Sequence, residues 1–249
     1  MNRDAFPDEA LTAAIRIFYQ PIVRLADMRT AHVEVLARVM TADGTLDGPQ
    51  AVLEAMDGTE RSMRLTSSIM QRALAEYDGL DFAAHDLGLA FNLPLDAMLH
   101  PELMGIIERV RRGSGLAVRN TSFELTERHP VHDLDAARVA ICDLSAAGYG
   151  LALDDITPQM PNLAALMAMP IRAIKLDRSV VMGAQAPMQE FIRTVSARAA
   201  SSGQEVIAEG IETGVIRARM RGLGVTHGQG FLFCPPLPAA ALRDFLRAA

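Results

Sequence analysis

The stretch 17-IFYQPIVRLADMRTAHVEVLARV-39 contains two strand-like apolar runs, 17–23 and 32–39. The link between them, 24-RLADMRTA-31, is too short to hold a helix. A pair of parallel strands needs a crossover connection of a dozen or more residues, whereas antiparallel strands can be joined by a short turn. The sequence therefore predicts that this first pair of strands forms an antiparallel hairpin.

After this hairpin, strand-like runs alternate with stretches of helical periodicity. The further strand-like runs are 87–93, 121–127, 149–155, 171–177, 205–210 and 226–233. The helix candidates are 50–56, 61–77, 101–112, 132–147, 162–169, 187–201 and 214–223. Eight strands with mostly strand-helix spacing in 249 residues are typical of an α/β protein with a TIM-like (β/α)8 barrel, here with an antiparallel first strand. A doubly wound open sheet is the alternative, but no glycine-rich phosphate fingerprint follows the first strand.

Composition places the chain among soluble globular proteins, and we expect a single domain over 1–249 with its core at about 15–240. Half of the residues are hydrophobic and 22% are charged. The net charge of −6 argues against DNA, RNA or an anionic membrane as partner. Two cysteines, Cys142 and Cys234, are too few for a disulfide framework, so a reducing cytoplasm is the expected setting.

The N-terminal segment lacks the apolar core of a signal peptide. No apolar run approaches the roughly 20 residues that a membrane span requires. We therefore expect a cytoplasmic domain; a membrane anchor or sensor domain of a larger, membrane-associated protein would lie outside this chain.

A polar residue lies within or at the end of every strand-like run. In chain order these residues are Gln20, Glu34, Arg38, Asn92, Glu124, Glu127, Asp154, Asp155, Lys175, Asp177, Glu209, Glu212 and Gln229. The active sites of barrel enzymes form at the carboxyl ends of the strands. An unpaired charge inside an apolar strand is costly, so these groups are expected to face each other. Their carboxylate and amide oxygens suit a hard divalent cation such as Mg²⁺ or Mn²⁺.

Each of these residues also has a simpler structural interpretation. A single Glu in an amphipathic strand is often solvated, Asp154 could cap a helix, and Lys175 could point outward. Gln229 could be a turn residue. His227 could ligate a metal, although a histidine in a loop is more often solvated. Six of the eight strands end in a carboxylate or carboxamide residue. This repetition is hard to reach by chance, so it favours a shared site.

The ordered motifs resemble the EAL domain family. They are 20-QPIV, 34-EVLAR, 92-NLP, 124-ELTE, 154-DD, 175-KLD, 209-EGIET and 229-QGFLFCPPLP, with Glu34-Val35-Leu36 in place of the Glu-Ala-Leu that names the family. The resemblance covers about residues 15–240. It implies a modified TIM barrel whose first strand runs antiparallel to the rest. It also implies binding of the bacterial second messenger cyclic di-GMP, which active members hydrolyse to linear pGpG.

The resemblance implies a role for each matching residue. Ligands of Mg²⁺ or Mn²⁺ would be Glu34, Asn92, Glu124, Asp154 and Asp155. Lys175 and Glu209 would orient or deprotonate the attacking water. The positions implied to bind or support the ligand are Gln20, Glu34, Leu36, Arg38, Asn92, Asp177, Glu212, Gln229 and Pro236. Glu127 would support the loop that follows the paired aspartates. Such a site would perform metal-assisted phosphodiester hydrolysis.

The loop after Asp155 departs from the family pattern. Active members read roughly Phe-Gly-Thr-Gly-Tyr-Ser-Ser, whereas this chain reads 156-ITPQMPN-162. Both glycines are absent, so a positive φ is no longer cheap at their positions. Prolines fix φ at two other positions. Pro161 stands where the family's serine would bond Glu127, and smaller departures occur at Pro94 and Arg128.

Two functions of different classes follow. The first is a cyclic di-GMP receptor with weak or absent hydrolysis, which passes the signal to protein partners of a signalling or motility pathway, a flagellar regulator included. The alternative is an active Mg²⁺- or Mn²⁺-dependent phosphodiesterase that produces pGpG. A homodimer is a further expectation, because this loop helps form the dimer in the family. A barrel without any nucleotide function is the third interpretation.

Overall fold

The computed structural model describes residues 12–41, 43–48, 52, 59–77, 87–126 and 134–248. Its strands are β1 (Ile15–Arg24), β2 (Thr30–Met40), β3 (Leu46–Asp47), β4 (Gly88–Pro94), β5 (Thr121–Thr126), β6 (Gly150–Ile156), β7 (Ala173–Leu176), β8 (Glu205–Ala208) and β9 (His227–Gly228). Its helices are α3 (Thr59–Tyr77), α5 (Leu95–Met98), α6 (Leu103–Arg112), the 3-10 helix η2 (Val118–Asn120), α7 (Leu134–Ala146), α8 (Leu163–Leu166), α9 (Arg178–Met182), α10 (Ala186–Ser201), α11 (Gly214–Gly222) and α12 (Ala239–Ala248).

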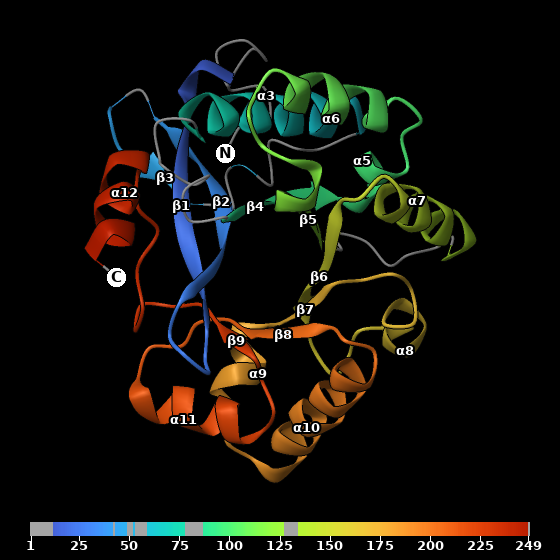
Figure 1. The fold of residues 1–249 in the computed structure, drawn as a ribbon, viewed down its shortest axis with the longest axis vertical. Helices are drawn as coiled ribbons and strands as arrows, with labels where there is room; N and C mark the ends of the chain where they lie inside the picture. The colour runs from blue at the N-terminus through green and yellow to red at the C-terminus, as the bar shows by residue number, and fades with distance from the viewer. Residues whose placement is uncertain are drawn as a thin grey trace.

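The strands form one closed ring with helices around it (Figure 1). The order is β1-β9-β8-β7-β6-β5-β4-β2, and β1 also pairs with β2, which closes the barrel; β3 extends the sheet beside β2. β1 is antiparallel to both of its neighbours, while β2 and the following strands of the ring pair in parallel. The predicted barrel with an antiparallel first strand is confirmed. The open-sheet alternative is wrong, because β1 pairs on both sides.

The predicted hairpin is also confirmed. β1 and β2 pair from Ile15↔Val39 to Val23↔Thr30, with one irregularity between Ile22 and Val23. In this register Gln20 lies opposite Glu34. Opposite residues of an antiparallel pair point to the same face of the sheet, so the hairpin places both polar side chains on one side.

Several elements differ from the sequence prediction. The helices α5, α9 and α12 were not predicted, and the candidate helix at 50–56 lies outside the described residues except for Val52. The expected last strand, 226–233, pairs with the sheet only at His227–Gly228. Beyond it the chain bends around Ile211, whose N–H donates to the carbonyl of Gln229 and whose carbonyl accepts from Leu232. Gly230 permits this bend, because a Cβ there would lie 2.3 Å from the Ile211 carbonyl oxygen.

The core has two parts. The larger part packs the outer faces of the strands against helices such as α3, α7 and α10. The smaller part consists of Ile22, Ala152, Ala173 and Ile207. Each of these four lies two residues before or after a polar residue of the upper barrel, and side chains two apart on a strand share a face. They therefore form an apolar layer inside the barrel, beneath the polar strand ends.

No helix among the described residues is long and apolar enough to cross a membrane.

Candidate functional site

A cavity of about 490 Å³ opens at the carboxyl ends of the parallel strands. Its lining includes most of the residues predicted from the strand ends: Gln20, Glu34, Leu36, Arg38, Asn92, Asp154, Asp155, Lys175, Glu209, Glu212 and Gln229. These residues come from seven strands, β1, β2, β4, β6, β7, β8 and β9, and the loops that follow them. Convergence of the strands therefore assembles them, as expected for a barrel.

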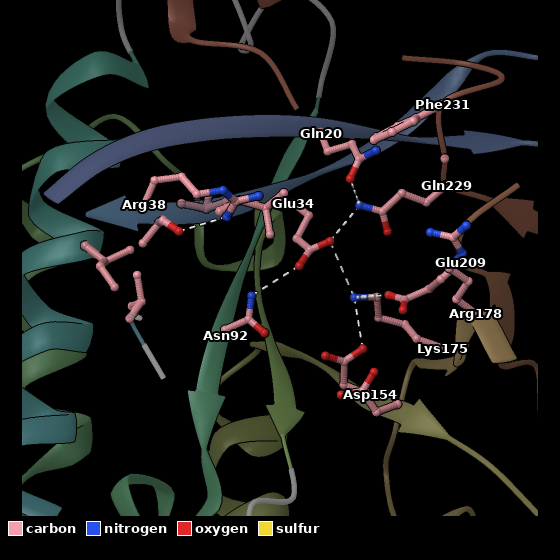
Figure 2. A pocket seen from close by; sticks show the side chains of 18 of the residues that line it. Gln20, Glu34, Arg38, Asn92, Asp154, Lys175, Arg178, Glu209, Gln229 and Phe231 are labelled. Carbon is pink, nitrogen blue, oxygen red and sulfur yellow. Dashed lines mark hydrogen bonds and ion pairs between the residues drawn. The ribbon is translucent and has the colours of Figure 1, made fainter. Parts of the chain in front are cut away.

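Lys175 is the centre of the site (Figure 2). Its side chain is only 1% exposed, and its Nζ lies 2.7 Å from Glu124, 2.7 Å from Glu209, 3.0 Å from Asp154 and 3.5 Å from Glu34. Burial opposes the charged form of this lysine, but the four carboxylates raise its pKa well above the ordinary value. The Lys175 side chain therefore stays charged, and its ammonium forms ion pairs with carboxylates from four different strands or the segments after them.

One ammonium does not balance this many carboxylates. Burial raises the pKa of Glu209 to about 8, despite the opposing effect of Lys175. Burial and the neighbouring Asp154 raise the pKa of Asp155 to about 6. Burial and the Glu34 charge raise the pKa of Glu124 well above its ordinary value. The site therefore carries an excess of acid that additional positive charge would stabilise.

Glu34 is held by amides on both sides. Asn92 Nδ2 donates to Glu34 Oε1 at 3.1 Å, and Gln229 Nε2 donates to Glu34 Oε2 at 2.6 Å. Burial alone would raise the pKa of Glu34, yet Lys175 and these two amides hold it below the ordinary value. Gln229 also donates to Gln20, whose own amide donates to the carbonyl of Cys234. This chain of hydrogen bonds fixes the Glu34 carboxylate in its ionised form.

Asp154 and Asp155 both reach the cavity, although neighbouring residues of a strand normally point to opposite faces. The pairing of β6 with β7 shifts register between Leu153 and Ile156, and Asp155 has a positive φ of 53°. This left-handed turn of the backbone brings the second carboxylate to the side of the first. An aspartate adopts this conformation more readily than most residues.

The donor set fits a hard divalent cation. Carboxylate oxygens of Asp154, Asp155 and Glu209 lie within 4.8 Å of one another. Asp154 Oδ1 is buried without a hydrogen bond, even though Lys175 Nζ lies 3.0 Å away at an ion-pair distance. Carboxylate oxygens this close together, one of them buried without a hydrogen bond, are the kind of donor set that a hard divalent cation prefers.

The remaining predicted residues lie at different distances from the cavity. Glu124 is buried beneath it against Lys175. Asp177 caps α9, where its Oδ1 accepts from the Ser179 N–H at 2.8 Å. Pro236 is not part of the lining, and Glu127 lies outside the described residues.

The lining also contains side chains that were not predicted from the sequence, among them Val52, Ile69, Arg178 and Phe231. Arg178 pairs with Glu212 at 2.7 Å, and Phe231 is 68% exposed. Arg178 directly follows the quoted 175-KLD stretch and Phe231 lies within the quoted 229-QGF stretch, so position beside a polar strand end was the available signal.

The loop that follows Asp155 forms its turn without glycine. The Met160 N–H donates to the Thr157 carbonyl at 3.1 Å, with Pro158 at the second position of the turn, where proline is favoured. Neither Thr157 nor Gln159 has a positive φ; Asn162, just before α8, has one of 57°. Positive φ therefore occurs at Asp155 and Asn162, and not at the two positions where the family pattern has glycine.

Metal-free protein is expected to lose stability as pH rises from about 5 to about 8. The folded pKa of Glu209 is about 8, above the value of about 4.3 for an unfolded glutamate. Its contribution is therefore fully present below the unfolded pKa and is lost as pH rises through the folded pKa. Melting curves recorded with chelator measure the Tm of Glu209→Gln and of the parent at each pH. The Tm of the variant relative to that of the parent should increase as pH rises. Parallel curves would contradict this role of Glu209.

Comparison with known proteins adds independent evidence. The sequence pattern of the EAL domain matches residues 4–236. The chain is 30% identical over 249 aligned positions to the cyclic di-GMP phosphodiesterase NbdA of Pseudomonas aeruginosa. The alignment covers 97% of this chain and 32% of NbdA. The chain thus spans about a third of the length of this curated relative.

Two solved structures share the fold at similar identity. The EAL enzyme Bd1971, in its cAMP- and cyclic-di-GMP-bound form, superposes with a TM-score of 0.86 at 26% identity, over 96% of this chain and 66% of that one. The manganese and cyclic-di-GMP complex of Klebsiella pneumoniae BlrP1 superposes with a TM-score of 0.78 at 26% identity, over 90% of this chain and 56% of that one. With its closed barrel, its antiparallel first strand and its ordered acidic motifs, the chain belongs to the EAL domain family.

Proposed function

We propose that this domain binds cyclic di-GMP at the carboxyl end of the barrel and acts mainly as a receptor, with weak or absent hydrolysis. The observation that carries the binding proposal is the cavity at the strand ends, in which the polar residues of the family motifs converge. Its volume of about 490 Å³ is in the range of small-molecule sites. The cyclic di-GMP named for Bd1971 and BlrP1 supports the choice of ligand.

The cavity offers partners for each part of a cyclic dinucleotide. The guanidinium groups of Arg38 and Arg178 line it and can bind phosphate oxygens. Phe231 is exposed at the rim, where an aromatic ring can stack on a base (Figure 2). Glu34, Gln229 and Gln20 form the fixed hydrogen-bonded wall behind these groups.

A divalent cation, Mg²⁺ or Mn²⁺, is the proposed cofactor. Asp154, Asp155 and Glu209 would hold it, with Glu34, Asn92 and Glu124 as the further ligands implied by the family motifs. When bound, such an ion lowers the pKa of a coordinated water and stabilises charge on the phosphate. Lys175 lies 2.7 Å from Glu209 Oε1, so this pair can orient a water molecule and hold its proton. The manganese named for BlrP1 supports this assignment.

The receptor proposal rests on the loop 156–162. It begins directly after the two aspartates and forms its turn through Pro158 and Asn162 instead of glycines. Misplacement of a catalytic group by about 1 Å can cost 10²-fold in rate while the ground-state contacts that bind the ligand remain. The alternative, an active phosphodiesterase, is favoured by the complete set of carboxylates around Lys175.

Binding and turnover in one sample distinguish these functions. Purified protein is titrated with cyclic di-GMP in a calorimeter with Mg²⁺ or Mn²⁺, and pGpG is measured by chromatography in the same mixture. Saturable binding with little pGpG supports the receptor. Turnover of about 1 s⁻¹ would make the chain an enzyme of ordinary rate. Absence of binding at tens of micromolar ligand would contradict both.

Glu34→Ala is expected to weaken cyclic di-GMP binding by roughly 10-fold to 100-fold, because Asn92 and Gln229 lose the charged acceptor that orients them. The Tm of the metal-free protein should fall, because the amides of Asn92 and Gln229 lose their buried acceptor, although Glu124, Asp154 and Glu209 remain around Lys175. Glu190→Ala, on the exposed face of α10, is the control and should leave the affinity unchanged. Unchanged affinity in Glu34→Ala would remove Glu34 from the binding site.

A receptor must pass its state to another molecule. We propose protein partners of a signalling or motility pathway, a flagellar regulator among them, and a cytoplasmic setting in which cyclic di-GMP is available. A homodimer through the region of the loop 156–162 is part of the same proposal. Size-exclusion chromatography with and without cyclic di-GMP measures whether the ligand changes the oligomeric state.

A further inference from the structure

A second polar cluster lies at the opposite, amino-terminal end of the barrel. It consists of His32 on β2, Glu205 at the start of β8 and His227 on β9. A residue of the upper site follows each of them along the chain. Glu34 follows His32 by two positions, and Gln229 follows His227 by two. Glu209 follows Glu205 by four. Side chains at even spacing on a strand share a face, so the cluster also points into the barrel.

An apolar layer separates the two sites. Ile22, Ala152, Ala173 and Ile207 pack together between them, and each is at most 6% exposed. Ile207 lies midway between Glu205 and Glu209 along β8. The lower cluster is therefore distinct from the cavity at the carboxyl ends and has its own opening, a cavity of about 390 Å³.

The cluster has the ligand types of a metal site, and its donor atoms lie close together. His32 Nε2 lies 3.0 Å from Glu205 Oε2, and the ligand atoms that the three residues offer lie within 4.8 Å of one another. Ligands about 2.0–2.1 Å from a tetrahedral zinc ion lie roughly 3.3 Å apart. Small side-chain rotations would bring all three donors to that spacing.

The ring orientation of His227 is set by its neighbour. The Thr226 hydroxyl donates to the Val206 carbonyl at 3.0 Å and accepts from the Val206 N–H at 2.9 Å. With its proton directed to the Val206 carbonyl, this hydroxyl can accept from the Nδ1–H tautomer of His227, whose Nδ1 lies 2.9 Å away. Nε2 of His227 then carries the free lone pair. A hydrogen bond of this kind to the other ring nitrogen is the usual support of a metal-binding histidine.

Glu205 is oriented in the same way. Its Oε2 faces His32, while its Oε1 lies 3.8 Å from Arg172 Nη2. Burial opposes ionisation, but His32, His227 and Arg172 together lower the pKa of Glu205 to about 2. Burial also lowers the pKa of His227, which favours the neutral imidazole that binds metals.

We propose that His32, Glu205 and His227 bind a divalent transition-metal ion, with Zn²⁺ as the best match. Two imidazoles and one carboxylate favour Zn²⁺ over Mg²⁺ or Mn²⁺, whose preferred donors are the oxygens of the upper site. Arg24, Arg119 and Arg172 line the same cavity, so the fourth coordination position suits a water or a small anion. The ion would join β2, β8 and β9, which are far apart in sequence, and stabilise the closed ring.

The test uses the full chain, stripped with chelator, and Co²⁺ as a spectroscopic probe of the nitrogen-containing site. Titration in the presence of saturating Mg²⁺ should give one equivalent of Co²⁺ with visible absorption, which Zn²⁺ displaces. Histidine-selective ¹⁵N NMR should show Zn²⁺ shifting the His32 and His227 rings but not that of His100, which lies in a loop outside the cluster.

Variants assign the site. His32→Ala and His227→Ala should each weaken Co²⁺ binding by roughly 100-fold or more, and Thr226→Val by roughly 10-fold through the loss of the support for His227. His100→Ala should bind Co²⁺ as the parent does, and so should Asp155→Asn, which alters only the upper site. If an alanine variant fails to fold, Glu205→Gln keeps the size of the side chain and should still lose the affinity.

Two results would overturn the proposal. One is a Co²⁺ equivalent that persists with the same affinity in both histidine variants. The other is an imidazole spectrum of His32 and His227 that Zn²⁺ does not change. Either result would leave the cluster as a hydrogen-bonded ion pair without a metal.

Discussion

Lys175→Met is expected to lower the free energy of unfolding of the metal-free protein by about 3–5 kcal/mol. The Lys175 ammonium is 1% exposed and lies within 3.5 Å of Glu34, Glu124, Asp154 and Glu209. Methionine fills a similar volume without charge, so the variant leaves four crowded carboxylates with no cation among them. Removing one partner of a buried ion pair is far more destabilising than removing the whole pair.

Urea unfolding with chelator measures this loss, and repetition with Mn²⁺ should recover part of it, because the ion supplies the missing positive charge. Arg178→Met is the matched control. Its ion pair with Glu212 is 59% and 38% exposed, so its loss should cost less than about 1 kcal/mol. Equal effects of the two variants would show that Lys175 does not hold the acidic cluster together.

Replacing 156-ITPQMPN-162 by Phe-Gly-Thr-Gly-Tyr-Ser-Ser is expected to raise the turnover of cyclic di-GMP by about 10²-fold while its Kd changes less than about 10-fold. The exchanged segment follows Asp154 and Asp155 directly and continues the backbone from the left-handed conformation at Asp155. Their exact placement matters most in the transition state, whereas the phosphate and base contacts also bind the ground state. Single-turnover formation of pGpG, measured beside calorimetric affinity, separates the two effects.

The matched control is the same graft with Pro161 retained. It restores both glycines but not the hydroxyl that would bond Glu127, so it should recover only part of the rate. The added glycines should cost stability by roughly 0.5–1 kcal/mol each. A full graft that folds, binds cyclic di-GMP and still gives no pGpG would locate the defect outside this loop, with Pro94 or the dimer geometry as the next candidates. Rapid hydrolysis by the unaltered chain would refute the receptor proposal.

The architecture was readable from the sequence because it depends on local patterns. The short link 24–31 requires an antiparallel hairpin, and the alternation of strand-like and helical stretches after it predicts parallel strands joined by helices. A polar residue at the end of each apolar run indicates a shared site, because parallel strands of a barrel bring their carboxyl ends to one rim. Most of the predicted residues from Gln20 to Gln229 accordingly line one cavity.

Other features depend on contacts between distant parts of the chain. Phe231 lines the cavity because the last strand ends at Gly228 and the chain then bends around Ile211, a contact between segments that are separate in the sequence. The pKa values of Glu209 and Asp155 follow from burial and from which acids become neighbours. Such electrostatic effects belong to the assembled site and not to any single segment.

The two ends of the barrel show most clearly which features follow from local sequence patterns and which depend on the tertiary structure. The sequence alone identified the upper site, since its acids stand in ordered motifs at strand ends. It could offer for His227 only two alternatives, a solvated histidine or a metal ligand, and it gave His32 no distinguishing mark. Only the closed ring brings His32 to 3.0 Å from Glu205, which is 173 residues away along the chain. The alternation of side chains is local, but the partner across a barrel is decided by closure, because closure fixes which strands face one another.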